Sequence, residues 1–190
     1  MTDTEPQEGQ WQPVTWLQFA LFSGGLFLFI LVMLACERGF VVILDHTNLA
    51  FHEAGHLFIG ILCGPLEVYG GTIGQCVFPV VLIVSFWRQG YPLSFAAGWI
   101  WLFENFFNIA RYMADARELV LPLVGGGGHD WNTIFDAWDV LRFDTTIAEW
   151  VVVAGWTGIG ATWCWVAWRA WRGRRMGAAN IQYPISNVQC

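Results

Sequence analysis

Two histidines and one glutamate lie within a single helical turn of an apolar segment, FHEAGHL at residues 51–57. Residues four positions apart lie on one face of an α-helix, so His52 and His56 can both direct an imidazole nitrogen at one metal ion. Glu53 follows the first histidine, where its carboxylate can act as general base towards a water that the metal activates. Zinc lowers the pKa of such a water towards about 7 and polarises a carbonyl group. The spacing therefore predicts a zinc site for hydrolysis, with His52 and His56 as ligands and Glu53 as the catalytic base.

The residues around this motif are those of a membrane helix. An ionisable side chain at the centre of a bilayer costs about 2.5–3.5 kcal/mol, so three of them in one turn favour a functional site. The alternative interpretation is a polar cluster that only forms hydrogen bonds with neighbouring helices.

A third metal ligand must come from elsewhere in the chain. His129 is the first candidate, because it follows the glycines at 125–128, a loop that can fold back towards a metal, and imidazole is a common zinc ligand. Asp115 is the second candidate, and Glu104 is assigned to proton transfer or to support of the ligands. The alternatives are that His129 caps a helix end and that Asp115 forms an ion pair with Arg111 four residues earlier.

A polar stripe runs along one face of the fourth apolar segment. It consists of Glu104, Asn108, Arg111 and Asp115. Lipid offers no hydrogen-bond partner, so this stripe must face something polar, and we expect it to hydrate the pocket. If the second helix begins near Asp45, Glu104 matches the depth of His56. If it begins near Gly39, the match favours Asn108, Asp115 and a folded-back His129. The two registers remain open at this point.

The composition is that of an integral membrane protein. Of 190 residues, 56% are hydrophobic and only 13% are charged, whereas soluble domains carry about 25% charged residues. All nine basic residues are arginine, and the net charge of −6 argues against a nucleic-acid partner. The partner implied by this composition is the lipid bilayer. The five cysteines are scattered and form no CxxC pair.

Apolar runs predict an all-α membrane bundle of about five transmembrane helices. The predicted spans are 16–36, 49–63, 70–87, 93–112 and 147–168. The chain then divides into a polar tail at 1–15, a membrane domain at 16–172 and a tail at 173–190. An outer loop at about 118–146 should be ordered against the bundle, and the spacing of Trp131, Phe135 and Trp138 predicts a short amphipathic helix within it.

The arginines predict the orientation. Four of them follow the last span, at 169, 172, 174 and 175, and the positive-inside rule assigns that end to the cytoplasm. Five spans then put the N-terminus outside, in a bacterial cytoplasmic membrane.

The segment FHEAGHLFIGILCG resembles the site-2 protease class of intramembrane zinc metallopeptidases, over about a quarter of the chain. The resemblance implies proteolysis of a membrane-protein substrate, with a distant Asp as third ligand in a motif close to N-P-D-G, which this chain lacks. Residues 70–75, GGTIGQ, resemble the Gly-rich segment near the substrate in that class. The phrase ADARELVLPLVGGGGHDW is similar to an uncharacterised bacterial membrane family that carries HEAGH.

Three functions are compatible with these residues. The first is a membrane-embedded zinc metallopeptidase. The second is a non-catalytic metal-binding subunit of a larger membrane complex, in which the metal braces the helices. The third is a bis-histidine haem carrier, which would need His46 or His129 because His52 and His56 share one helix face.

Overall fold

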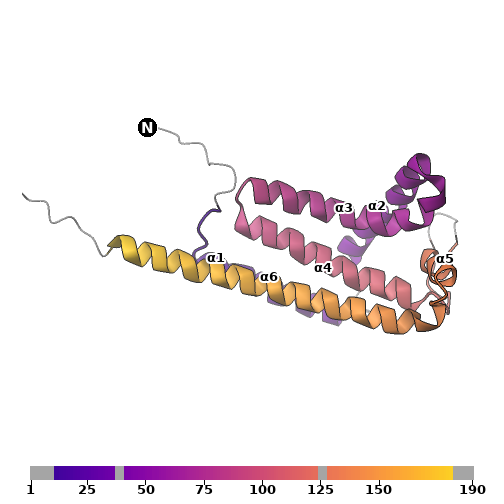
Figure 1. Cartoon of the computed structure of the whole chain (residues 1–190). Helices are drawn as coiled ribbons and strands as arrows, with labels where there is room; N and C mark the ends of the chain where they lie inside the picture. Colours follow the sequence, from indigo (N-terminus) through magenta and orange to yellow (C-terminus); the bar gives the residue numbers. More distant parts are fainter. Residues whose placement is uncertain (1–10, 37–40, 124–127, 182–190) are drawn as a thin grey trace, which may run out of the picture.

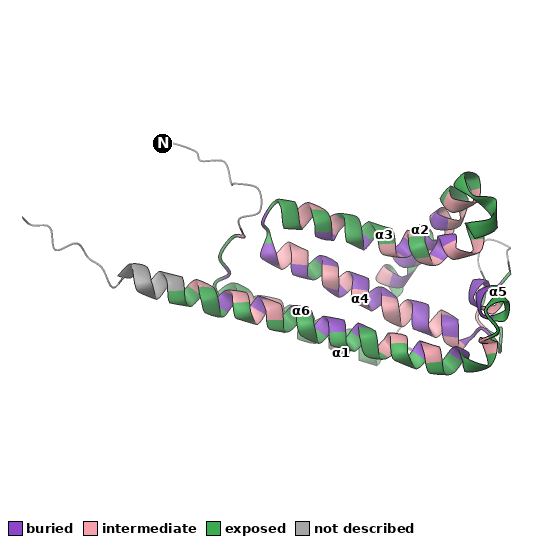
Figure 2. Cartoon of the chain, viewed as in Figure 1, coloured by how far each residue is buried: buried purple, intermediate pink, exposed green. Residues whose placement is uncertain are grey.

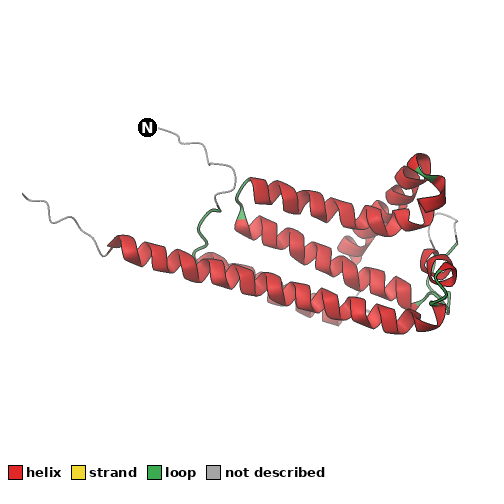
Figure 3. Ribbon diagram, in the orientation of Figure 1, coloured by secondary structure: helices red, strands yellow, loops and turns green. Residues whose placement is uncertain are grey.

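The computed structural model describes residues 11–36, 41–123 and 128–181, with side chains described as far as Arg175. All the regular elements in these ranges are helical (Figure 3), which confirms the all-α prediction. The α-helices are α1 (Trp16–Ala35), α2 (Val42–Leu62), α3 (Glu67–Arg88), α4 (Pro92–Ala114), α5 (Asp130–Ala137) and α6 (Asp144–Ile181). Two short 3₁₀ helices, η2 (Gly64–Leu66) and η3 (Leu141–Phe143), precede α3 and α6. The outer parts of the predicted tails, 1–10 and 182–190, and residues 125–127 of the glycine run lie outside the described residues.

Helix α2 begins at Val42, seven residues before its predicted start near Leu49. The first turn is stabilised by Asp45, whose carboxylate accepts a hydrogen bond from the backbone N–H of Val41 at 2.6 Å. Helix α6 continues to Ile181, so the predicted boundary between membrane domain and tail at 172/173 falls inside a helix. Helices α1, α3 and α4 begin and end close to the limits of the predicted spans.

Within the described residues, three helical stretches are long and apolar enough to cross a membrane: Trp16–Ala35, Gly64–Arg88 and Leu141–Arg175. They contain α1, α3 and most of α6. The large apolar side chains on their outer faces are exposed, as on Leu17 and Leu21 of α1 and Val81 of α3. Figure 2 shows this distribution, with buried residues concentrated where the helices face one another. Both features are those of a protein whose outer surface meets lipid.

The long helices α1, α3, α4 and α6 run side by side, and α2 crosses them obliquely near the end where α5 lies (Figure 1). Helix α4 lies between α3 and α6 and has the largest number of buried residues among the described helices. Glycines allow close packing on α6, since a methyl group at Gly158 would overlap the Phe103 ring of α4. This packing makes α4 the central helix of the bundle.

The segment before α1 packs against the bundle. Gln12 donates its backbone N–H to the Gly90 carbonyl at 2.9 Å, and Arg169 of α6 donates to the Gln12 carbonyl at 2.9 Å. Trp11 packs its ring against that of Trp165, with 5.2 Å between centroids. Residues 11–15 therefore lie at the same end of the bundle as the α3–α4 turn and the C-terminal half of α6. The side of the membrane on which each terminus lies stays a prediction.

The predicted short helix in the outer loop is present as α5. Its Trp131, Ile134 and Phe135 side chains are at most 7% exposed, and they pack with residues of α4 and α6 such as Met113 and Ala148. Burial of each large apolar side chain stabilises the fold by about 1.5–3 kcal/mol, so α5 is held firmly against the bundle. Trp138, which follows α5, is 54% exposed.

Candidate metal centre

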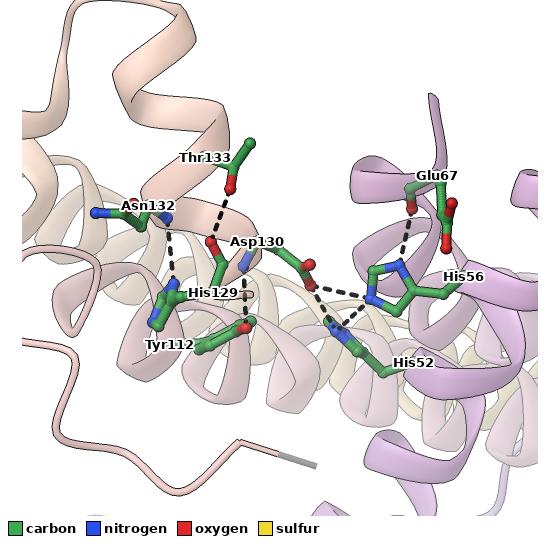
Figure 4. Close-up of polar contacts among 8 residues, drawn as sticks. All are labelled: His52, His56, Glu67, Tyr112, His129, Asp130, Asn132 and Thr133. Atoms are coloured by element: carbon green, nitrogen blue, oxygen red, sulfur yellow. Dashed lines mark hydrogen bonds and ion pairs between the residues drawn. The ribbon is translucent and has the colours of Figure 1, made fainter. Parts of the chain in front are cut away.

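Three ligand atoms from α2 and α5 converge at one point (Figure 4). The Nε2 atoms of His52 and His56 lie 2.9 and 3.0 Å from the same Asp130 oxygen, Oδ2, and 3.1 Å from each other. The three side chains are mostly buried, with exposures of 9%, 20% and 11% for His52, His56 and Asp130. This group of two imidazoles and one carboxylate could hold a metal ion.

The orientation of His56 is set by its other ring nitrogen. Nδ1 lies 2.8 Å from the backbone carbonyl oxygen of Glu67, which can only accept a hydrogen bond, so Nδ1 carries a proton. In a neutral imidazole, Nε2 then presents its lone pair to the Asp130 oxygen. Two lone pairs 3.0 Å apart repel unless a positive charge lies between them, either a proton on Nε2 or a metal ion. A backbone carbonyl that fixes the tautomer is the usual outer partner of a metal-binding histidine.

Asp130 reaches the two histidines because α5 begins there. The backbone N–H of Asp130 donates to the Tyr112 hydroxyl of α4 at 3.1 Å, and Asn132 donates its side-chain amide to the Ala116 carbonyl at 2.8 Å. These two bonds and the buried apolar side of α5 attach the start of the helix to the end of α4. The Asp130 carboxylate is thereby positioned over α2.

The absence of a side chain at Gly71 is what allows α3 to approach His52. A Cβ at this position would overlap the His52 ring, with the nearest atom being Nε2. Gly55, Gly70 and Gly74 bring the backbones of α2 and α3 together in the same way, because a Cβ at each would overlap the partner helix. The Gly-rich segment singled out in the sequence is therefore the helical surface on which the H-E-x-x-H turn rests.

We expect Gly71→Ala to lower the metal occupancy of the site. The added methyl group meets the His52 ring, which lies between α3 and Asp130, so His52 must turn away from Asp130. Metal analysis of the purified variant measures the effect, and an occupancy equal to wild type would contradict it. Gly160→Ala on α6 is a matched control, because a Cβ there has nothing within 4 Å.

His129 and Asp115, the third-ligand candidates from the sequence, lie outside this group of three. His129 caps α5: its Nδ1 accepts the backbone N–H of Asn132 at 3.1 Å. Its Nε2 lies 3.4 Å from Asp115 without forming a hydrogen bond. Burial lowers the pKa of His129, which keeps the ring neutral at pH 7. Asp115 accepts the backbone N–H groups of Val120 and Leu121 at 3.1 and 3.0 Å, so it closes the turn after α4.

The rest of the polar stripe on α4 pairs with α2. Asp45 is 1% exposed and accepts hydrogen bonds from Arg111 and Asn108, both at 2.6 Å. Asn48 donates to Glu104 at 2.9 Å and accepts the Trp101 indole N–H at 2.9 Å. These pairs satisfy groups that lipid cannot, and they explain why α2 carries so many polar residues. Arg111 therefore has an ion-pair partner on another helix, Asp45, in addition to any contact on its own helix.

His52, His56 and Asp130 line a cavity of about 1260 Å³. This volume is larger than the 300–1,000 Å³ typical of small-molecule sites. Glu53, His52, His56 and Asp130 all line it, together with Tyr112. Its wall also includes apolar residues of several elements, namely Val42, Leu49, Pro65, Val68, Leu121, Pro122 and Leu123. A carboxylate that could act as base and a candidate metal site therefore face the same space.

Asp130 is the site residue that the sequence reasoning did not select. It stands beside His129, after the glycine run, and no spacing rule separates the two neighbours. The signal in favour of Asp was the resemblance to the site-2 protease class, which implies a distant Asp as third ligand. The comparison of the chain with protein-family models, curated proteins and solved structures finds no match.

Proposed function

We propose that this protein is a membrane-embedded zinc metallopeptidase that hydrolyses peptide bonds of a membrane-protein substrate. The observation that carries the proposal is the convergence of His52, His56 and Asp130 at the wall of a cavity that Glu53 also lines. Metal analysis of the purified protein tests the ligand set, and the turnover of a Glu53→Gln variant tests the hydrolysis.

The donor set fits zinc. Two imidazole nitrogens and one carboxylate oxygen, with a fourth position left for water, make up a common catalytic zinc site. Bonds of 2.0–2.2 Å at tetrahedral angles separate ligand atoms by about 3.3–3.5 Å. The three atoms here are 2.9–3.1 Å apart, so they would need to move outward by only a few tenths of an ångström. The third ligand in this proposal is Asp130, in place of His129 or Asp115.

The roles of the residues follow from their positions. Bound between His52, His56 and Asp130, zinc would supply a positive charge that polarises the scissile carbonyl and acidifies a water molecule. Glu53 would take a proton from the attacking water and deliver it to the leaving amine. The carbonyl of Glu67 would hold His56 in the tautomer that leaves Nε2 free.

The membrane topology in this proposal has four crossings, α1, α3, α4 and α6, instead of five. The contacts of Gln12 with Gly90 and Arg169 support it, because they hold the segment before α1 and the C-terminal half of α6 at the same end of the bundle. Arg88 and the four arginines from 169 to 175 lie at this end, which the positive-inside rule assigns to the cytoplasm of a bacterial cell. Helix α2 would then enter the bilayer from the outer side without crossing it, which places the metal site near the outer face.

We expect labelling from outside to separate the four-crossing topology from the five-span one. In a cysteine-free background, Asp136→Cys should react with a membrane-impermeant maleimide in right-side-out vesicles. Gln12→Cys and Arg174→Cys should react only after permeabilisation, because their segments lie at the other end. All three positions are exposed. Labelling of Gln12→Cys in intact vesicles, with Arg174→Cys protected, would contradict four crossings and support five.

A further inference from the structure

Gln75 of α3 is a buried polar side chain that faces the cavity. The residue is 2% exposed, and it lines the same cavity as His52, Glu53 and Asp130. Within the described part of the chain its carboxamide forms no hydrogen bond to any other residue. The remaining polar residues on this part of the wall are already paired: Asp45 bonds to Asn108 and Arg111. Gln75 is therefore an amide at the cavity wall without a hydrogen-bond partner among the described residues.

Because this amide forms no hydrogen bond within the protein and faces the cavity, it is available to a polar group of a bound molecule. A carboxamide has one acceptor oxygen and two donor hydrogens. A partner that satisfies both sides must offer a donor and an acceptor on the same side, as the N–H and C=O of one extended peptide residue do. A purely apolar ligand or a lone anion would leave one side of the amide unpaired.

The position of Gln75 fits a role beside the reacting bond. Gln75 follows Gly71 by four residues and so lies on the same face of α3, about 6 Å further along the helix. Gly71 is the point where α3 touches the Nε2 atom of His52. A peptide that reached the metal ligands through this cavity would therefore extend past Gln75 with a neighbouring peptide group.

We propose that Gln75 binds the backbone of the substrate, with its oxygen accepting a peptide N–H and its NH₂ group donating to a peptide carbonyl. This inference rests on the proposed peptidase function and names the recognition of its substrate. Gln75 would determine how tightly an extended peptide binds, and it would not hold the metal or transfer a proton.

Three hydroxamates test this assignment by equilibrium binding to the zinc-loaded protein. Acetohydroxamate carries a metal-binding group alone, a peptidyl hydroxamate adds two apolar residues, and an ester analogue replaces the peptide N–H with oxygen. We expect the peptidyl probe to bind wild type at least about tenfold more tightly than its ester analogue, since a lost partner leaves the buried amide unpaired. In Gln75→Met the two should bind equally, because the variant lacks the acceptor, and acetohydroxamate should bind as it does to wild type.

The stability of Gln75→Met is the second readout. Methionine keeps the length of the side chain and removes only groups without protein partners, so the melting temperature should stay the same or rise. Thr72→Val is a matched control, since it removes a buried hydroxyl of α3 that faces a different cavity. It should keep the preference for the peptidyl probe.

The outcomes separate this inference from the proposed function. Failure of acetohydroxamate to bind wild type would remove the metal site and the peptidase proposal with it. Binding of acetohydroxamate together with an unchanged preference in Gln75→Met would overturn the role of Gln75 alone. A large fall in melting temperature in Gln75→Met would also overturn it, because it would mean that the amide supports the fold.

Discussion

Replacing Asp130 with Ala is expected to release the metal ion from the purified protein. The change removes the one carboxylate that both His52 and His56 contact, and the two imidazoles left on one helix face are too few for a tight tetrahedral site. Loss of an outer partner already costs about 10–100-fold in metal affinity, so loss of a ligand should exceed that range. His52→Ala and His56→Ala should have the same effect. Zinc per chain, measured by elemental mass spectrometry after dialysis, reports the outcome.

Two control variants make this result specific to the ligands. His129→Ala removes the cap of α5, which costs about 0.5–2 kcal/mol of helix stability, but leaves Asp130 present, so it should retain zinc. Asp136→Ala changes an exposed carboxylate on the same helix and should behave as wild type. Full zinc in Asp130→Ala together with loss of zinc in His129→Ala would reverse the ligand assignment and restore His129 as the third ligand.

Glu53→Gln is expected to reduce turnover of a membrane substrate by about 10²–10⁴-fold, the usual contribution of a general base. Glutamine keeps the shape of the side chain and removes the base, and Glu53 is not one of the three converging ligands. Zinc content and melting temperature should therefore match those of wild type. Accumulation of uncleaved substrate in cells that carry the variant measures the loss of turnover.

This variant also separates the peptidase from a non-catalytic metal-binding subunit. A metal that only braces α2 against α5 needs the ligands but not the base, so on that hypothesis Glu53→Gln would have no effect while His52→Ala would be defective. That pair of results would overturn the peptidase proposal. Glu149→Gln removes an exposed carboxylate from α6, away from the cavity, and serves as the matched control.

Both experiments depend on features that the sequence predicted to different degrees. The pairing of His52 with His56 follows from the i, i+4 spacing, which the helix itself imposes once apolar neighbours make the segment helical. The first turns of α1 and α4 also depend on local signals. Thr15 and Gln18 form a capping box at the start of α1, and Pro92 lies in the first turn of α4. The amphipathic spacing of Trp131 and Phe135 predicted α5 for the same reason, since each signal acts within a few residues.

The third ligand was decided by tertiary structure. His129 and Asp130 are adjacent in sequence, but α5 begins between them, and successive helical residues point about 100° apart. His129 therefore caps the helix while Asp130 faces α2. That direction depends on how Trp131 and Phe135 seat α5 against α4, and on Tyr112, which holds the Asp130 backbone. No pattern in a single sequence encodes the relative rotation of two helices.

The oblique path of α2 was likewise decided by packing. Hydrophobicity counts apolar residues and so predicted a fifth span, but it carries no information on the partner that each polar residue meets. Asp45 and Asn48 bond to α4, and Gly55 contacts the backbone of α3; together these contacts set the angle at which α2 enters the bundle. The sequence by itself thus determined the helices and the two histidines, because those depend on local spacing. Only the tertiary structure decided which carboxylate joins them, because contacts between distant segments depend on the shapes of packed helix faces.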